Sequence, residues 1–478
     1  MPGLVPRVRL WLLPGLLAGC VIAFAAGSGS LSEAKRIGLP TRWAFLFALA
    51  AAGLVEAALV LRQRPFPRGL LRFAPFPAAF AWVAIVSAGW SFVPRASFER
   101  GVSVTVLFVA AAALAVVADG SPGVRRRLFV GLGAGAGVVA LLGFLMLAAG
   151  VDASAQKGGE VTPWRFRGFG ENPNTVAILA AVALPIVVWL GLTGRSSRSR
   201  AVWALSGTLL LATDIATESR GGLLGAFVGG AFVLGMLIEE WPKKLSAVAA
   251  FTAAVAVGIV LRQATQPPRE AFVSTVQPGS VTTVASTQLP KPQPHSRPQA
   301  QPKPPPPPIA PQVLPPRADE IGHPALSIQN VTAAASGRIA AWEGALHLVA
   351  RRPLVGYGFG TEDKVFVDRW YAYQSARPEN SAIGLLLQLG IVGLGLMLTI
   401  VGVLAWYSIR VLRGDDHDRR SVAVVGLGVL FAALAVTLIQ SYVYAVGNIA
   451  VLTVWVTLFL LAAEVVGRKP RDRTGVRG

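Results

Sequence analysis

The sequence has little of what soluble enzymes and metalloproteins use. Only 14% of its 478 residues are charged, whereas soluble proteins carry about 25%. Cys20 is the single cysteine, so neither an intrachain disulfide nor a cysteine metal cluster can form. The four histidines are scattered without a metal-binding spacing, so we expect no metal and no cofactor. The net charge of +20 could suggest nucleic acid, but no contiguous basic domain with interleaved aromatics is present, and we expect no such partner.

Apolar residues, in contrast, make up 53% of the chain and gather in runs of membrane-spanning length. A bilayer admits only helices or closed barrels, and these runs are continuous rather than alternating, which favours helices. We therefore predict an all-α polytopic membrane protein with about twelve transmembrane helices. The predicted spans are 10–27, 42–61, 74–93, 101–118, 128–150, 174–193, 201–218, 221–238, 245–262, 381–409, 421–443 and 448–466.

Lysine and arginine are distributed unequally between the two sides of this arrangement. The loops on the N-terminal side, with the C-terminal tail, carry 23 of them, and the short loops on the other side carry nine. Because cytoplasmic loops are enriched in these residues, both termini are predicted to be cytoplasmic. The protein would then be a multi-pass protein of the cytoplasmic (inner) membrane, with the large loop 263–380 outside.

Composition divides the chain further. Residues 267–316 hold 16 of the 34 prolines and cannot build a core, so 263–325 is predicted to be a disordered external insert. Residues 326–380 have helical apolar spacing and turn residues, which predicts an ordered external cap. The predicted domains are 1–262 (about nine helices), the insert 263–325, the cap 326–380, the C-terminal helices 381–466 and the basic cytoplasmic tail 467–478.

Three external loops hold polar residues next to spans. Residues 164–174 combine arginines with aromatics and suit an anionic, partly apolar ligand, although a turn with interfacial anchors would look the same. Arg220 joins two spans at nearly membrane depth, where it needs an anion or a partner such as Glu218. Glu379 precedes the tenth span beside Asn380, and it is either a general base or an ordinary acid at a helix N-terminus.

Four blocks of residues in these loops form a recognisable set. They are Arg167-Gly168-x-x-Glu171-Asn172-Pro173-Asn174; Ser219-Arg220-Gly221-Gly222-Leu223-Leu224; Ser336-Gly337-Arg338-x-x-x-Trp342 followed by Pro353-Leu354-x-Gly356-Tyr357-Gly358; and Glu379-Asn380 leading into Gly390-Ile391-x-Gly393. In order and external placement they resemble the O-antigen ligase and O-antigen polymerase family of lipid-linked glycan transferases. The family's ligases usually have histidine where this chain has Glu379.

The resemblance implies a GT-C-like, metal-independent glycosyltransferase. It would transfer a glycan from undecaprenyl diphosphate to a hydroxyl of a lipid, glycan or protein acceptor, at an external site with the lipid tail against the spans. Arg220 and Arg338 would bind the diphosphate, Arg167 would assist, and Glu379 would deprotonate the acceptor. Asn380 would orient the acceptor, and Asn174, Trp342 and Tyr357 would contribute to substrate binding.

Two other functions fit a chain of many spans. A transporter or flippase of lipid-linked sugars is one, although such proteins usually show repeat-related halves, and these two halves differ. A non-catalytic scaffold that recruits partners through the proline-rich insert is the other. The sequence does not distinguish a ligase from a polymerase.

Overall fold

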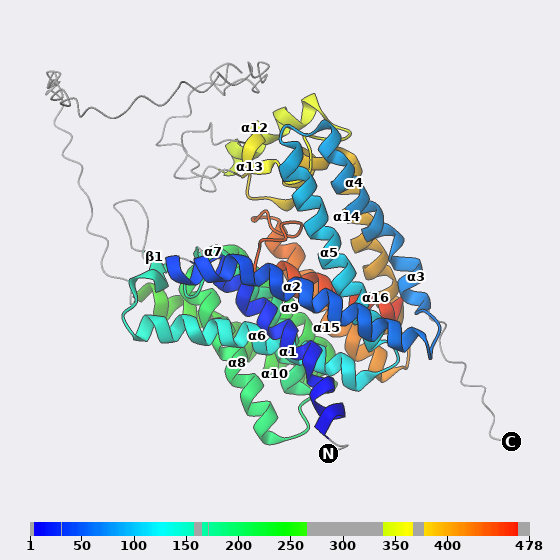
Figure 1. Ribbon diagram of the computed structural model, residues 1–478. Coiled ribbons are helices and arrows are strands. Elements are labelled where there is room, and N and C mark those ends of the chain that lie inside the picture. Colours follow the sequence, from blue (N-terminus) through cyan, green and yellow to red (C-terminus); the bar gives the residue numbers. More distant parts are fainter. Residues whose placement is uncertain are drawn as a thin grey trace, which may run out of the picture.

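The computed structural model describes residues 4–29, 31–156, 165–170, 172–264, 338–366 and 377–466. Within these residues the protein is almost entirely helical, with a single two-stranded sheet (Figure 1). Nearly all of the predicted proline-rich insert (263–325) and the basic tail (467–478) lie outside the described residues, as do Glu171, Ser336 and Gly337.

The N-terminal half consists of helices joined by short turns. They are α1 (Leu4–Gly27), α2 (Ser32–Leu61), α3 (Arg68–Phe73), α4 (Pro75–Val86) with the 3-10 turn η1 (Ser87–Trp90), α5 (Pro94–Ala118) and α6 (Pro122–Ala148). The 3-10 turn η2 (Asp152–Ser154) follows, and then the antiparallel strands β1 (Ala155–Gln156) and β2 (Arg165–Phe166), which pair Ala155 with Phe166. This small sheet joins α6 to the helices that follow.

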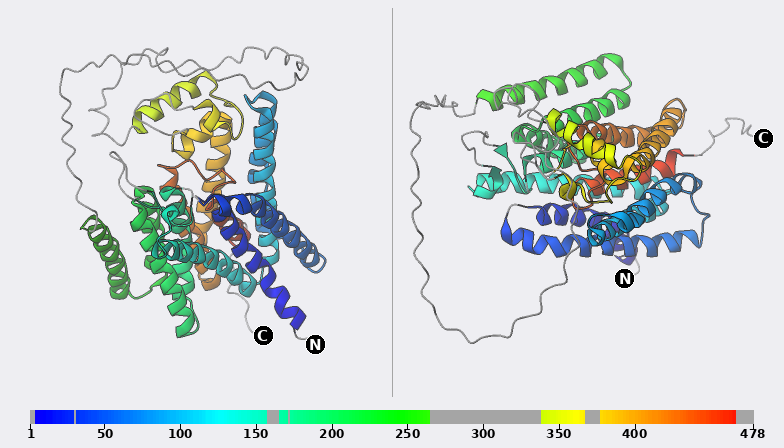
Figure 2. Two further views of the ribbon diagram at one scale, coloured as in Figure 1. Left: turned by 60° about the vertical axis from the view of Figure 1, so that its left-hand side comes forward. Right: turned by 90° about the horizontal axis from the view of Figure 1, so that it is seen from above.

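The rest of the described chain adds four helices, the cap and three further helices. They are α7 (Pro173–Leu192), α8 (Ser197–Thr217), α9 (Arg220–Leu237) and α10 (Trp241–Ala264); α12 (Arg338–Arg351) and α13 (Glu362–Val365); and α14 (Ser381–Leu412), α15 (His417–Thr437) and α16 (Val451–Val465). Figures 1 and 2 show α12 and α13 at the same end of the molecule as the N-terminus of α5.

Each predicted span overlaps one of these helices, which confirms an all-α polytopic membrane protein. Seven described helices are long and apolar enough to cross a membrane: α2, α5, α6, α7, α9, α14 and α15. Shorter apolar segments lie at Trp11–Gly27, Pro75–Trp90 and Val451–Val465. The count of twelve spans and the GT-C-like architecture stay predictions.

The last two predicted spans differ from the structure at the ends that face each other. The predicted spans are 421–443 and 448–466, but α15 ends at Thr437 and α16 begins at Val451, so residues 438–450 are not helical. Side chains at the start of α14 supply the missing backbone partners: the Asn380 amide donates to Leu438 O at 3.0 Å, and Ser381 Oγ donates to Gln440 O at 2.7 Å. Apolar composition alone cannot reveal that side chains distant in sequence will take the place of the helical hydrogen bonds of this segment.

The α14 helix is kinked at Gly390, which has φ 61° and ψ −158°. Only glycine adopts this conformation without strain, and a Cβ here would overlap the carbonyl of Leu354. The kink frees backbone groups that the turn 353–358 satisfies. Tyr357 N donates to Leu387 O and Gly358 N to Gln388 O, both at 2.9 Å, and Ile391 N donates to Pro353 O at 2.8 Å. These hydrogen bonds attach the cap to α14 four residues before Glu362 in the sequence.

At the opposite end, an ion pair joins α6 to α16. Arg125 contacts Glu464 across 339 residues of sequence, and each side chain is only 5% exposed. Both residues lie at helix ends that the charge distribution assigns to the cytoplasmic side. The pair therefore links two termini of spans that are predicted to face the same compartment.

Candidate functional site

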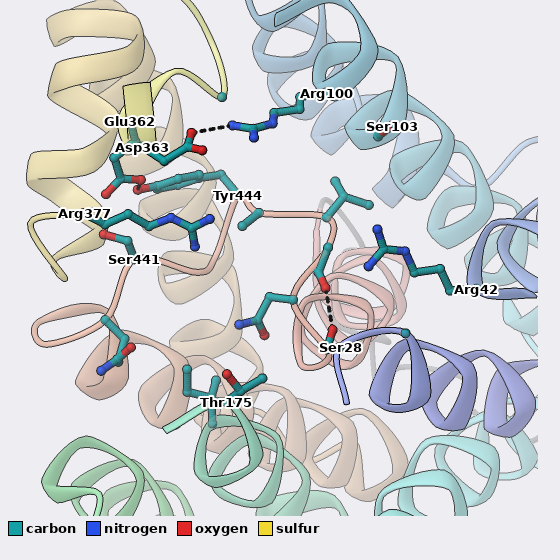
Figure 3. A pocket seen from close by; sticks show the side chains of 18 of the residues that line it. Ser28, Arg42, Arg100, Ser103, Thr175, Glu362, Asp363, Arg377, Ser441 and Tyr444 are labelled. Atoms are coloured by element: carbon teal, nitrogen blue, oxygen red, sulfur yellow. Dashed lines mark hydrogen bonds and ion pairs between the residues drawn. The ribbon is translucent and has the colours of Figure 1, made fainter. Parts of the chain in front are cut away.

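A pocket with a cavity volume of about 420 Å³ lies where several helix ends meet (Figure 3). It is lined by the corner between α1 and α2, the starts of α5, α7 and α14, the cap residues 359–363 and the non-helical segment 438–450. All of these are ends that the charge distribution predicts to be external. The charged lining residues are Lys35, Arg42, Arg100, Arg377, Glu362, Asp363 and Glu379.

Glu362 supplies the most deeply buried carboxyl group of this pocket, with 4% of the residue exposed. Its Oε2 accepts hydrogen bonds from Tyr444 Oη at 2.8 Å and from Gln388 Nε2 at 3.2 Å. The Gln388 Oε1 in turn accepts from Gly360 N at 2.6 Å. A Cβ at Gly384, on the first turn of α14, would collide with the Tyr444 hydroxyl, so glycine makes room for this network.

The environment of Glu362 favours its protonated form. Burial raises the pKa of the carboxyl, and the nearby Glu379 raises it further, although the Ser441 hydroxyl, the hydrogen bond from Tyr444 and the charge of Arg377 oppose the rise. Desolvation is the largest of these effects, because an ionised carboxylate loses its hydration when it is buried. The net direction is upward.

Glu379 also lines the pocket, and its backbone is held on both sides. Trp342 Nε1 donates to the carbonyl of the preceding Pro378 at 2.8 Å. The following Asn380 caps α14, with Oδ1 accepting from Ala382 N at 3.0 Å and from Ile383 N at 3.2 Å. Between them Glu379 adopts a left-handed conformation, with φ 53°. Such strain persists only where the surroundings fix it, and it is frequent at functional sites.

The facing wall of the pocket is basic. Lys35 and Arg42 lie on one face of α2 at a spacing of seven residues, and the Arg42 guanidinium stands 5.3 Å from the centroid of the Trp43 ring. On α5, Arg100 Nη1 contacts Asp363 Oδ1 at 3.1 Å and so ties this wall to the cap. Figure 3 shows Arg42 on the side opposite Glu362 and Tyr444. The pocket can thus offer an anionic substrate positive charge and a carboxylate at once.

The other predicted charged residues gather elsewhere, in a cluster that we call the α8–α9 corner (Arg165, Asn174, Glu218, Arg220 and Arg338). Arg165 donates to Asn174 Oδ1 at 2.9 Å and to the Thr217 carbonyl at 2.7 Å. Burial is the main cause that lowers the pKa of Arg165. The charge of Glu218 raises this pKa and the charge of Arg338 lowers it, so both residues lie near Arg165. Arg220 begins α9 two residues after Glu218 and is exposed.

The first turn of α7 lies between this corner and the pocket. Asn172 and Thr175 line the pocket, whereas Asn174 reaches Arg165 in the corner. Asn172 also caps the helix by accepting a hydrogen bond from Thr175 N at 3.0 Å, as the Asn-Pro-Asn turn predicts. The two sets of charges are therefore neighbours across a single helical turn.

The remaining predicted substrate-binding residues make backbone contacts. Arg167 donates to the carbonyls of Ala153 and Ala155, both at 3.1 Å. Tyr357 is buried in the cap, where its hydroxyl donates to Leu348 O at 2.9 Å and its ring stacks on Phe92. Trp342 and Asn380 hold the backbone on either side of Glu379, as described above. Of the predicted residues, Glu379 lies in the pocket, and Arg220, Arg338 and Asn174 lie at the α8–α9 corner.

Sequence reasoning missed several lining residues. Glu362 follows the glycine-rich turn of the cap but belongs to none of the four motif blocks. Tyr444 sits at the end of an apolar run, and Arg42 and Arg100 counted only as loop charges. No motif marks them, because tertiary contacts bring them together. In the described part of the chain, no three His, Cys, Asp or Glu side chains are grouped as a metal site requires.

The fold and this pocket define a polytopic helical membrane protein with a charged pocket at one end of its helices. Residues 205–398 match the family model described as O-antigen ligase, which confirms the predicted resemblance to the O-antigen ligase and polymerase family over that part of the chain. Three of the four motif blocks fall inside the match; the block at 167–174 precedes it. No curated protein matches the chain.

Proposed function

We propose that the protein is a glycosyltransferase that moves a glycan from undecaprenyl diphosphate to an acceptor hydroxyl on the external face of the cytoplasmic membrane. The observation that carries this proposal is the position of Glu379. It occupies the place of the family's histidine, and it lines a pocket whose facing wall carries Lys35 and Arg42. A carboxylate within reach of an acceptor hydroxyl, in a site that also attracts phosphate, is what the transfer requires.

In the proposed reaction the acceptor oxygen forms a bond to the anomeric carbon, and the bond from that carbon to the phosphate oxygen breaks. The electron pair leaves with the lipid diphosphate, and the acceptor proton passes to the Glu379 carboxylate. Negative charge grows on the leaving phosphate, so fixed guanidinium groups stabilise it. We assign this role to Arg220 and Arg338 at the α8–α9 corner.

The supporting residues act through position. Arg167 fixes the loop beside β1 by its two backbone hydrogen bonds, and Arg165 holds Asn174 in the corner. Trp342 and Asn380 immobilise the backbone around Glu379, so we assign Asn380 to the orientation of this base. Tyr357 belongs to the packing that fixes the cap on α14. The lipid tail would lie against the spans.

The test is the transfer activity of Glu379 variants. Removing a general base slows such reactions by about 10²- to 10⁴-fold, so Glu379→Gln should lose transfer of a lipid-linked glycan to that extent. Glu379→His restores the family's residue and should keep measurable activity. Glu99→Gln is the matched control, because Glu99 is exposed at the start of α5 and paired with Arg95. Full activity of the Glu379→Gln protein would remove the base assignment.

A deletion strain distinguishes the two family activities. If intact polymer accumulates on the lipid carrier, the protein is a ligase; if single repeat units accumulate, it is a polymerase. An unchanged profile of carrier-linked and surface glycan would contradict both.

A further inference from the structure

A second carboxyl group of the pocket, Glu362, has a role that the motifs do not assign. Oε2 has two hydrogen-bond partners, Tyr444 and Gln388, whereas Oε1 has none among the described residues and is inaccessible to solvent. An ionised carboxylate left so incompletely satisfied would be costly to bury. The geometry is more favourable if the group carries a proton.

The hydrogen-bond network decides which oxygen carries that proton. Gln388 Oε1 is occupied by the N–H of Gly360, so the amide nitrogen is the atom that faces Glu362. An amide N–H can only donate, so Oε2 is an acceptor. A proton on Glu362 therefore resides on Oε1, which has no acceptor among the described residues.

The charges around Glu362 point in the same direction. The groups that face it are Glu379 and Arg377 at the start of α14, and Ser441 and Tyr444 from the segment between α15 and α16. Its neighbour Asp363 is already paired with Arg100 of α5. Two ionised carboxylates, Glu362 and Glu379, in a pocket that receives an anionic donor would repel each other and the substrate. Burial raises the pKa of Glu362, which favours the neutral form of this group.

We propose that Glu362 works as a neutral carboxylic acid, which donates a hydrogen bond from Oε1 to an oxygen atom of the glycan substrate. This role rests on the proposed glycosyl transfer and divides the work between two carboxyls. Glu379 acts as the base that accepts the acceptor proton, and Glu362 is protonated and orients the sugar. Where the environments of two neighbouring carboxyl groups give them different pKa values, one group commonly acts as an acid and the other as a base.

The experiment is a pH–rate profile of transfer by the purified full-length protein in detergent, with an undecaprenyl-diphosphate-linked glycan as donor. The neutral form of Glu362 is the active one, so wild-type activity should fall as rising pH ionises it. Glu362→Gln keeps a donor and cannot ionise; it should lose no more than about tenfold in rate and should lack this alkaline decline. Glu362→Ala removes the donor and should fall about a further 10- to 100-fold.

Two neighbouring variants separate this role from a purely structural one. Tyr444→Phe removes a hydrogen bond that stabilises the carboxylate form, so the alkaline decline should move to higher pH. Asp363→Asn changes the adjacent carboxyl of the same helix and should leave the decline in place. The inference is overturned if the decline persists in Glu362→Gln, or if the Gln variant is as inactive as the Ala variant. If the wild-type protein transfers no glycan at any pH, the proposed function itself fails.

Discussion

At the scale of single residues, two glutamates share an unusual backbone conformation. Glu218 and Glu379 both have φ of 53° and are the non-glycine residues with positive φ in the described chain. Each directly precedes a helix cap: Ser219 Oγ accepts from Gly222 N at the start of α9, and Asn380 caps α14. One glutamate belongs to the α8–α9 corner and the other to the pocket. Backbone strain is thus confined to the two places where we assign chemistry.

Because of this strain, we expect the substitution Glu379→Gly to affect stability and activity in opposite directions. Glycine tolerates the left-handed region, so Glu379→Gly should leave the protein as stable or more stable, by up to about 1 kcal/mol. The variant should nevertheless lose transfer, because it lacks the carboxylate. Unfolding followed in detergent, together with the transfer assay, measures both.

Glu33→Gly is the control for that comparison. Glu33 lies in the first turn of α2 with ordinary helical geometry, so the same substitution should destabilise the protein by about 1 kcal/mol. Equal losses of stability in the two variants would show that Glu379 is not strained. Its conformation would then carry no functional meaning.

The candidate site was only partly predictable from its residues. Short motifs identify Glu379, Arg220 and Arg338 because their types and spacings are local features of the sequence. Glu362 and Tyr444 are 82 residues apart, and Arg42 comes from a helix near the N-terminus, so no local pattern could bring them together. The αL conformation of Glu379 is equally hidden, since nothing in a Pro-Glu-Asn sequence requires it.

At the scale of secondary-structure elements, apolar runs predicted the helices because a bilayer leaves the backbone no alternative. They did not predict the kink of α14, which depends on hydrogen bonds from the turn 353–358, nor the non-helical segment 438–450. Both irregular segments are stabilised by partners distant in sequence, and both help to build the pocket. The positions of irregular backbone therefore locate the pocket more closely than the composition of the sequence does.

The buried ion pair Arg125–Glu464 between α6 and α16 gives a prediction about stability. Substituting Glu464 with Gln leaves the Arg125 charge buried without its ion-pair partner and should cost about 3–5 kcal/mol. Replacing both residues by apolar ones, Arg125→Met with Glu464→Leu, should recover most of that loss. Denaturant unfolding of the three proteins in detergent measures the difference.

The exposed pair Arg36–Glu33 on α2 is the matched control. Its side chains are 78% and 74% exposed, and such pairs contribute only about 0–1 kcal/mol. Glu33→Gln should therefore change stability little. A similarly small effect of Glu464→Gln would show that the α6–α16 pair does not hold these helix ends together.

At the scale of the whole molecule, the topology explains why the pocket forms where it does. Every segment that lines it comes from a helix end predicted to be external, and the pair Arg125–Glu464 joins two ends predicted to be cytoplasmic. The charge bias of the loops predicts two groups of helix ends, and the lining of the pocket and the Arg125–Glu464 pair each fall within one of these groups. Which helices touch each other was not predictable, because nearly every helix offers similar apolar faces.

The predicted orientation can be tested because Cys20 is the single cysteine of the chain and is fully buried. Ser32 and Ser197 are exposed first residues of α2 and α8, which the topology places on opposite sides of the membrane. In intact cells a membrane-impermeant maleimide should label Ser32→Cys and leave both the wild-type protein and Ser197→Cys unlabelled. Ser197→Cys should react once the membrane is permeabilised. Because Lys35, one turn after Ser32, lines the pocket, labelling of Ser197→Cys alone in intact cells would place the pocket in the cytoplasm and exclude an external transfer reaction.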